Sequence, residues 1–306
     1  MGWKSDIQAA AERITGHIQV TPTLQVLNFG LNYPIELKLE HMQHTGSFKA
    51  RGAFNTLLSQ PVPPAGLVAA SGGNHGAAVG YAAHKLGHRA RIYVPEMAGP
   101  AKISLIEATG ADLQVVPGAY ANALELAQDY EAETGAMQVH AYDAPATVAG
   151  QGTCFAEWQA QGLQADTLLI AVGGGGLIAG AMAWFDGSKK IVAVEPETSC
   201  ALHAALQAQK PVDVEVSGVA ANALGAKRIG NICFDLAQSQ NITSVTVTDA
   251  AITAAQVALW RQHRILVEPA GATALAALMS GAYSPTPDER VAVLICGGNI
   301  APDPLG

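Results

Sequence analysis

The sequence is poor in charged residues and in cysteine, and both scarcities limit what the protein can be. Only 14% of its 306 residues are charged, and the net charge is −8. A nucleic-acid footprint or a polybasic membrane patch needs clustered Lys and Arg, so we expect neither nucleic acid nor membrane as a partner. The four cysteines lie far apart and form no C-x-x-C pair. That spacing argues against a disulfide scaffold or a zinc site and suits a reducing compartment.

A secretory signal is also lacking. The N-terminal stretch "MGWKSDIQAAAERI" contains early acidic residues and no apolar core, so we expect a cytoplasmic protein. Residues 167–185, "TLLIAVGGGGLIAGAMAWF", form an uncharged run nearly long enough to cross a bilayer. Four consecutive glycines at its middle would interrupt a membrane helix. We therefore interpret this run as a strand, a loop and a buried helix.

What the sequence does have is an alternation of strand-like and alanine-rich helical runs. The expected helices include residues 75–87, 120–135 and 249–264. The expected strands are residues 35–40, 67–71, 90–95, 113–117, 167–172, 191–195, 244–249 and 291–296. This alternation predicts an α/β fold with open, largely parallel sheets and helices on both faces.

Two linker-like stretches indicate where the chain divides into domains. The Pro-rich segment "SQPVPPAG" at 59–66 is the clearest break, and "AYDAPATVAG" at 141–150 is a second one. We predict a large domain made of residues 1–62 and 144–306, with a small inserted domain at 65–143.

Glycine clusters follow three of the expected strands. They are "SGGNHG" at 71–76, "GGGG" at 173–176 and "GGN" at 297–299. Open α/β sheets bind ligands at the carboxyl ends of their strands. Three glycine-rich strand exits in one chain are more than turns alone require, so we expect a ligand site where they meet.

The tetraglycine stretch allows two interpretations. Glycines between a strand and a helix let backbone N–H groups converge on an anion such as a phosphate, with the helix dipole adding to the attraction. No Lys or Arg occurs from 103 to 188, so amides alone from this part of the chain would hold the phosphate. Alternatively, Gly174, Gly176 and Ala179 fit the dinucleotide pattern G-x-G-x-x-A, and Glu195 would then meet a ribose. That alternative leaves the other two glycine clusters unexplained.

Lys49 stands in "TGSFKARGAFN", a stretch with the features of a helix start that Ser47 would cap. The residue is either an exposed first-turn lysine or an amine held out of water for chemistry. An amine becomes nucleophilic near neutral pH when desolvation or nearby positive charge lowers its pKa. We interpret Arg51 as an ordinary surface or inter-element charge.

"GSFKARGA", followed in order by "SGGNHG", "GGGGLIAG" and "CGGN", resembles the fold-type II pyridoxal-phosphate enzymes, the tryptophan synthase β-like fold. Within them the chain is most similar to the serine/threonine dehydratase (threonine ammonia-lyase) and serine racemase group. The similarity extends to "VHAYDAPATVAGQGT" at 139–153, "AVEPE" at 193–197 and "EPAGATALAAL" at 268–278. These ordered motifs are specific for fold and cofactor and less so for substrate.

The resemblance implies a role for each motif. Lys49 would form the Schiff base with pyridoxal 5'-phosphate and later take the Cα proton of an amino-acid substrate. Phe48 would pack on the cofactor ring and Asn74 would bond its hydroxyl. The phosphate would be held by the backbone of Gly173, Gly174, Gly175 and Gly176. The substrate carboxylate would be received by Ser71, Gly72, Asn74 and His75.

Cys296 would face the pyridine nitrogen in this group. A carboxylate at that place keeps the ring protonated and makes it a strong electron sink, whereas a neutral thiol does not. Prompt loss of a β-hydroxyl fits a thiol better than transamination does. A buried core cysteine at a strand end is compatible with the same role.

Two departures from the group narrow the prediction. Racemases carry a Ser as a second acid–base residue where this chain has Gly72, so elimination is favoured over racemisation. The group's divalent metal site uses a Glu, a carbonyl and an Asp. Glu195 and Ser199 match the first two, but Ala201 replaces the Asp, so we do not expect a tight metal site.

We therefore predict a pyridoxal-phosphate-dependent dehydratase of L-serine, L-threonine or a related uncharged β-hydroxy amino acid, giving a 2-oxo acid and ammonia. The substrate is expected to be uncharged because the small-domain stretch with Tyr120 and Asn122 contains no Arg or Lys. The resemblance also implies a homodimer. A serine racemase with side dehydratase activity is the nearest alternative, and an NAD-binding dehydrogenase is more remote.

Overall fold

The computed structural model describes residues 2–71, 73–118 and 120–300, and its strands form two sheets. The larger sheet has six strands, and all neighbouring pairs are parallel except β1 with β2. Their spatial order is β1 (Thr23–Val26), β2 (Ile35–Leu39), β10 (Val291–Ile295), β7 (Thr167–Ala171), β8 (Lys190–Pro196) and β9 (Thr243–Val247). The central strands β7 and β10 are buried at all five positions, as their unbroken apolar sequences require in a sheet covered on both faces.

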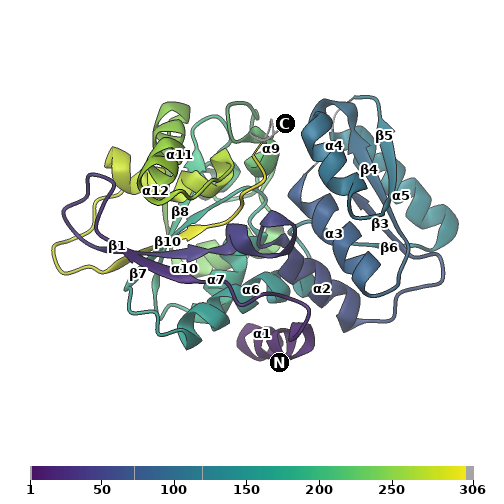
Figure 1. The fold of residues 1–306 in the computed structure, drawn as a ribbon, viewed down its shortest axis with the longest axis horizontal. Coiled ribbons are helices and arrows are strands. Elements are labelled where there is room, and N and C mark those ends of the chain that lie inside the picture. The colour runs from purple at the N-terminus through teal and green to yellow at the C-terminus, as the bar shows by residue number, and fades with distance from the viewer. Residues whose placement is uncertain (1, 72, 119, 301–306) are drawn as a thin grey trace.

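The smaller sheet has four strands, and all of them are parallel. Their order is β5 (Asp112–Val116), β4 (Ala90–Pro95), β3 (Leu67–Ala70) and β6 (Met137–Gln138). It lies beside the larger sheet, with α2 and α3 between the two in the view of Figure 1. The small sheet is built from residues 67–138, within the predicted inserted segment. The predicted domain boundaries themselves stay a prediction.

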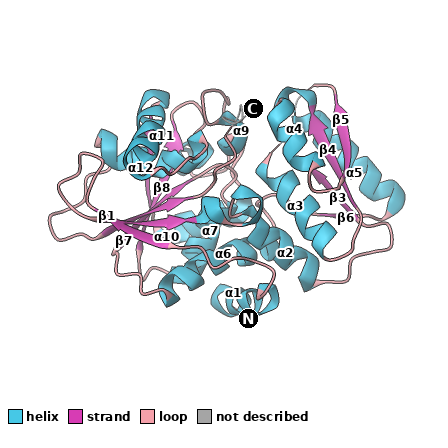
Figure 2. Cartoon of the chain, viewed as in Figure 1, coloured by secondary structure: helices cyan, strands magenta, loops and turns pink. Residues whose placement is uncertain are grey.

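Helices pack on both sheets, as Figure 2 shows. Those of the first half are α1 (Trp3–Ile14), α2 (Lys49–Ser59), α3 (Asn74–Lys85), α4 (Pro100–Glu107), α5 (Tyr120–Thr134) and α6 (Pro145–Ala160). The remaining ones are α7 (Gly176–Phe185), α8 (Ala201–Ala208), α9 (Ala221–Leu224), α10 (Asn231–Gln240), α11 (Asp249–His263) and α12 (Pro269–Ser280). Three short 3-10 turns are η1 (Glu40–Met42), η2 (His44–Gly46) and η3 (Glu96–Ala98).

The expected α/β architecture is confirmed, and the eight expected strands are present with ends within two residues of the prediction. Strands β1 and β6 were not expected. Residues 167–185 form β7, a glycine turn and the ten-residue helix α7. Among the described residues, no helix is long and apolar enough to cross a membrane.

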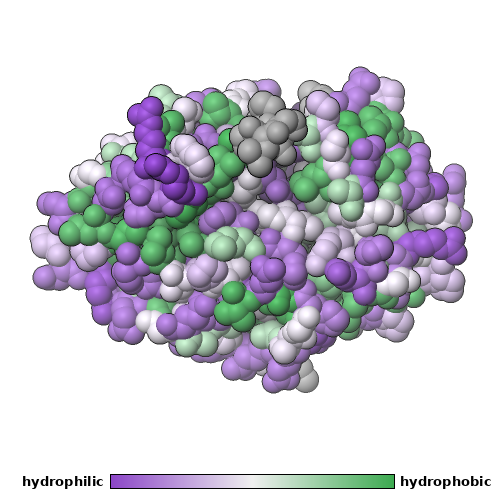
Figure 3. Space-filling model, in the orientation of Figure 1, coloured by the Kyte–Doolittle hydropathy of each residue, from purple (hydrophilic) through white to green (hydrophobic). Residues whose placement is uncertain are grey.

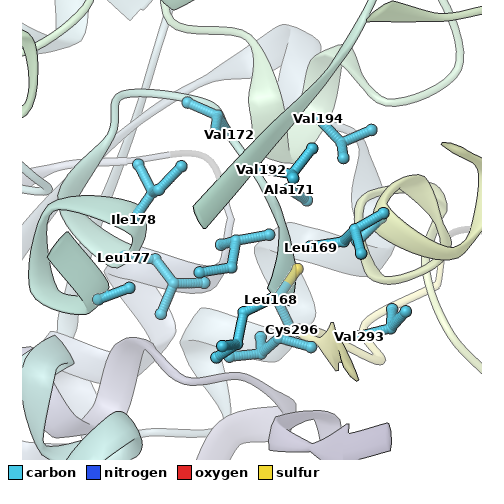
Figure 4. Packing of buried hydrophobic residues seen from close by; sticks show 14 of the residues in the cluster. Leu168, Leu169, Ala171, Val172, Leu177, Ile178, Val192, Val194, Val293 and Cys296 are labelled. Atoms are coloured by element: carbon cyan, nitrogen blue, oxygen red, sulfur yellow. The ribbon is translucent and has the colours of Figure 1, made fainter. Parts of the chain in front are cut away.

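The large sheet carries the main hydrophobic core. Figure 4 shows the side chains of β7, β8 and β10 meeting those of α7, with Cys296 among them. On the face drawn in Figure 3, apolar side chains gather mainly on the side of the large sheet, among mixed polar ones. The core reaches the glycine-rich exits of β7 and β10, since Val172 and Cys296 belong to it.

A buried network of charges lies behind α2. Arg51 is fully buried, and its guanidinium binds both carboxylate oxygens of Glu40 at 2.7 Å. The same group reaches Glu157 at 2.9 Å, and Lys38 binds the other oxygen of Glu157 at 2.6 Å. The interpretation of Arg51 as a surface charge was therefore wrong. It is an inter-element charge that ties α2 to η1 and α6, because only paired ions are tolerated inside.

Replacing Arg51 tests this network. Arg51→Met should lower the free energy of unfolding by about 3–5 kcal/mol, because the Glu40 carboxylate would stay buried without its partner. Urea denaturation measures the change. Arg290→Met is the control, since Arg290 pairs with Asp166 in an exposed position and its loss should leave stability nearly unchanged. Equal effects of the two variants would contradict a structural role for the buried network.

Candidate active site

The glycine-rich turn after β10 is hydrogen-bonded to the segment that begins α2. Gly298 N–H donates to the Gly46 carbonyl at 2.8 Å, and Phe48 N–H donates to the Cys296 carbonyl at 3.3 Å. Ser47 and Gly297 pair as an isolated bridge between these hydrogen bonds. The turn after β10 therefore fixes the segment that leads into Lys49, although the two are about 250 residues apart in the sequence.

Lys49 is the first residue of α2 and is half-buried. Its Nζ donates to the Ala141 carbonyl at 2.8 Å and lies 5.2 Å from the centre of the Phe48 ring. Burial lowers the pKa of Lys49 to about 8, against a weaker opposing effect of Cys296. An amine with this pKa is partly neutral, and so nucleophilic, near physiological pH. The alternative of an exposed first-turn lysine is excluded.

The expected cap of α2 is wrong. The residue before the helix is Phe48, with no side-chain cap, and the buried Ser47 hydroxyl has no hydrogen-bond partner among the described residues. The physical reason is the bridge to Gly297. It holds Ser47 extended, and the Ser47 hydroxyl donates to or accepts from none of the described residues, so it does not cap the first turn of α2.

The tetraglycine turn connects β7 to α7, as predicted. Gly175 has a φ of 95°, a conformation that favours glycine. A Cβ on Gly174 or Gly176 would collide with Tyr142, and one on Gly173 would lie 2.9 Å from the Leu224 Cα. Side chains are therefore excluded from this turn, and its backbone N–H groups remain at the N-terminus of α7. That is the arrangement that binds a phosphate.

Asn74 is the first residue of α3, and its side chain forms hydrogen bonds with residues that adjoin the larger sheet. Its Nδ2 donates to Glu268 Oε1 at 2.5 Å, and its Oδ1 accepts from Asn299 Nδ2 at 2.9 Å. Asn299 also donates to the Thr45 carbonyl at 2.7 Å. The predicted cofactor-binding asparagine is therefore fixed by residues from the last turn and from the segment before α12.

The predicted substrate loop is placed in part. Ser71 ends β3, and its hydroxyl accepts from the Gly73 N–H at 3.3 Å. His75 is buried, and its Nε2 lies 2.8 Å from the Val139 carbonyl. Burial, with Lys49 nearby, lowers the pKa of His75 to about 3, so this ring is neutral and donates to that carbonyl. Gly72 lies outside the described residues.

Cys296 follows β10 directly and is buried, with its Sγ 3.4 Å from the Ala270 carbonyl. Burial raises the pKa of the thiol, and Glu268 adds to the effect. Cys296 therefore stays a neutral thiol at physiological pH. This is the property that its expected place at the pyridine nitrogen requires.

The two weak metal candidates have other partners. Both oxygens of Glu195 accept backbone N–H groups at the start of α8, from Leu202 at 2.8 Å and His203 at 2.7 Å. Burial raises the pKa of Glu195 to about 8. The Ser199 hydroxyl donates to the Leu224 carbonyl. No group of three His, Cys, Asp or Glu side chains suited to a metal occurs in the described part of the chain. The helix start also occupies the carboxylate that the dinucleotide interpretation assigned to a ribose.

These features fit pyridoxal phosphate. The site combines a buried amine of lowered pKa, a turn closed to side chains that presents backbone amides, a neutral thiol and an amide donor. The amine suits an aldehyde, and the amides suit a phosphate. Two largely parallel sheets frame the site, and together fold and site define an α/β pyridoxal-phosphate enzyme of fold type II.

Comparison with known proteins supports the assignment to the pyridoxal-phosphate enzymes. The sequence model of the family "Pyridoxal-phosphate dependent enzyme" matches residues 14–297. A phenylserine dehydratase from Ralstonia pickettii is 32% identical over 302 residues, which cover 96% of this chain and 92% of that protein. The structure of a threonine deaminase from T.th. is 33% identical, with a TM-score of 0.90 and 98% and 99% of the two chains covered. A maize serine racemase structure is 26% identical, with a TM-score of 0.92 and coverage of 98% and 94%.

The chain thus belongs to the fold-type II pyridoxal-phosphate enzymes and is related to threonine dehydratases and serine racemases. Its cofactor is pyridoxal 5'-phosphate.

Three residues of this site were not singled out from the sequence. Glu268 and Asn299 lie within quoted motifs, "EPAGATALAAL" and "CGGN", but only the structure brings them to Asn74. Lys102 stands just before the stretch without Lys or Arg, and it lies 4.0 Å from Glu268. The signal available in the sequence was the presence of charged residues in apolar surroundings.

The lowered pKa of Lys49 predicts how the cofactor-free protein captures an aldehyde. The rate of capture of pyridoxal phosphate should rise with pH around a midpoint of about 8, because only the neutral amine reacts. Absorbance after rapid mixing at each pH measures the rate, and Lys49→Met supplies the background from other amines. A midpoint near 10.5, the ordinary value, would contradict the desolvated site.

The lowered pKa of Lys49 also makes the free energy of unfolding depend on pH. Between pH 8 and 10.5 the unfolded chain holds a proton on Lys49 that the folded chain has released. The free energy of unfolding contributed by Lys49 therefore rises with pH in this window. The difference between the cofactor-free native protein and Lys49→Met, measured by urea denaturation, should shift in favour of the native protein as pH rises. A flat difference would contradict the assignment.

Proposed function

We propose that this protein is a pyridoxal-phosphate-dependent dehydratase of L-serine, L-threonine or a related uncharged β-hydroxy amino acid. It would release a 2-oxo acid and ammonia. The observation that carries the proposal is the pairing of the half-buried Lys49 amine with a buried neutral thiol, Cys296, at the end of β10. Family membership supports the same reaction class.

Bound pyridoxal phosphate supplies an aldehyde for the substrate amine and a conjugated ring that withdraws electrons from Cα. Lys49 Nζ takes the proton from Cα, for which its lowered pKa suits it. The electron pair left at Cα then forms the Cα=Cβ double bond as the Cβ–O bond breaks. The hydroxyl leaves as water, and the proton that it takes up balances the one that Lys49 removed from Cα. The 2-aminoacrylate or its homologue reacts with water in solution to give the 2-oxo acid and ammonia.

The other residues bind and orient. Gly173 to Gly176 hold the phosphate through backbone N–H groups, and Phe48 packs against the ring. Asn74 donates to the ring oxygen. Ser71, Gly72, Asn74 and His75 receive the substrate carboxylate, and Asn74 and His75 do so with their backbone N–H groups at the start of α3, because their side chains have other partners. Cys296 would face the pyridine nitrogen as a neutral thiol, because burial raises its pKa, and would supply no negative charge to keep that nitrogen protonated. Charge at Cα is then short-lived, which favours immediate loss of the β-hydroxyl.

The substrate side chain is proposed to be uncharged. Lys102 stands beside the substrate loop, since a Cβ on Gly73 would lie 3.2 Å from its Nζ, and it faces the carboxylate of Glu268 at 4.0 Å. Because its charge is already balanced by Glu268, Lys102 would bind a carboxylate on the substrate side chain only weakly. The similarity to a phenylserine dehydratase supports testing an aromatic β-hydroxy amino acid beside serine and threonine.

Serine racemisation is the second candidate, because the maize serine racemase has nearly the same fold. Glycine at position 72 provides no side chain to return a proton to the opposite face of Cα, which supports elimination instead. The homodimer, the cytoplasmic location and the absence of a required divalent metal remain part of the proposal.

The reaction is tested directly on purified protein loaded with pyridoxal phosphate. Oxo-acid release is measured for L-serine, D-serine, L-threonine, 3-hydroxyaspartate and phenylserine. We expect release from an L-β-hydroxy amino acid without a second carboxylate, and a loss of at least about 10³-fold in kcat for Lys49→Ala, which removes the proton acceptor.

Chiral analysis of the unreacted serine in the same samples separates the two candidates. Little D-serine should form from L-serine per turnover. Rapid formation of D-serine with little oxo acid would contradict the dehydratase and favour the racemase. Full activity of Lys49→Ala would contradict both.

A further inference from the structure

Lys102 is a buried amine that the proposed reaction does not use. It belongs to α4 and is only 3% exposed. Its Nζ donates to the Asn222 carbonyl at 3.3 Å and lies 4.0 Å from Glu268 Oε2. Both partners come from elements of the larger sheet, and Figure 1 shows α4 facing α9 across the space between the two parts. A small cavity of about 40 Å³ adjoins these groups, lined by Lys102, Asn222, Glu268 and Asn299 among others.

The position of this amine connects it to the site. A Cβ on Gly73 would lie 3.2 Å from Lys102 Nζ, so the amine stands against the substrate loop. A lysine this buried is costly unless its charge is matched. Glu268, which is equally buried, is the matching carboxylate.

Glu268 links the positive charge of Lys102 to the orientation of the Asn74 side chain. Burial raises the pKa of Glu268, while Lys102 and Asn74 oppose that rise and favour the carboxylate. An ionised carboxylate only accepts hydrogen bonds. Asn74 must therefore turn its amide nitrogen toward Glu268, as the 2.5 Å contact shows. Asn299 reinforces this orientation by donating to Asn74 Oδ1.

These contacts leave one N–H of the Asn74 side-chain amide for another acceptor. An amide nitrogen carries two protons, and one of them is directed to Glu268. The second N–H has no acceptor among the described residues, so it can face the cofactor. A donor at the ring oxygen stabilises that oxygen in its ionised form, with the proton on the lysine-bound nitrogen instead. If the amide were reversed, its oxygen would require a proton on the ring oxygen.

We propose that Lys102 and Glu268 are positioning residues, which hold the Asn74 amide so that its N–H faces the ring oxygen of pyridoxal phosphate. The chain of contacts runs from Lys102 through Glu268 to Asn74, and it couples α4 of the smaller sheet to the cofactor ring. This inference rests on the role proposed above for Asn74.

The test is the absorbance of the protein loaded with pyridoxal phosphate. The lysine-bound cofactor has two tautomers, and the one with an ionised ring oxygen absorbs at the longer wavelength. In Lys102→Met, Glu268 loses its cation and its pKa rises further, and the protonated carboxyl can donate to Asn74 Oδ1 and so reverse the amide. The ratio of the long- to the short-wavelength band should fall roughly tenfold, the factor expected for one charge-assisted hydrogen bond.

Three further variants sharpen the test. Lys102→Arg keeps the charge and should restore the ratio to within about twofold of the native protein. Glu268→Gln can both accept from and donate to Asn74, and its ratio should fall in the same direction. Lys190→Met is the matched control, since Lys190 pairs with Glu289 while 48% exposed, and its ratio should not change. Cofactor affinity, measured by fluorescence titration, identifies any variant that has lost the site altogether.

The inference is overturned if Lys102→Met binds the cofactor and keeps the native band ratio. If Lys102→Met does not fold, Glu268→Gln decides in the same way. A native protein that binds no cofactor, or shows neither band, would instead mean failure of the proposed function. The two failures are therefore distinguishable.

Discussion

The short ladder of backbone bonds between residues 46–48 and 296–298 is the constraint on which the site depends. It fastens the start of α2 to the exit of the central strand β10. Lys49 and Cys296 thereby become neighbours, and each influences the pKa of the other. The ladder also leaves Ser47 extended and its hydroxyl without a partner among the described residues. That is a local cost which a surface helix would not bear.

Burial and charge are balanced differently on the two sides of α2. Behind the helix, Arg51 has two carboxylates and remains charged. In front of it, Lys49 has a carbonyl partner, at 2.8 Å, and a neutral thiol nearby. The same element therefore holds one cation firmly ionised and one amine ready to lose its proton. The ion-paired network of Arg51 fixes the position of α2. Lys49 can therefore stay desolvated without a carboxylate partner, since strain and desolvation at a site persist only when the surroundings determine the geometry.

Much of the fold followed from the sequence because the strands of both sheets are short, β-branched or apolar runs with glycine or proline at their ends. Strands β1 and β6 were not predicted because they have four and two residues and are edge strands defined by their neighbours. The sequence motifs indicated Lys49, Asn74 and the tetraglycine turn, and these are the residues proposed to bind the cofactor. The burial of Arg51, the displaced cap at Ser47 and the meeting of Lys102 with Glu268 depend on contacts between distant segments, which local sequence does not encode.

The central claim is that Lys49 is the residue that holds the cofactor. Reduction of the loaded protein with borohydride fixes the cofactor to its lysine, and peptide mass analysis then locates it. The account predicts one pyridoxyl group for each chain, attached to Lys49. A group on another lysine, or none at all, would contradict it.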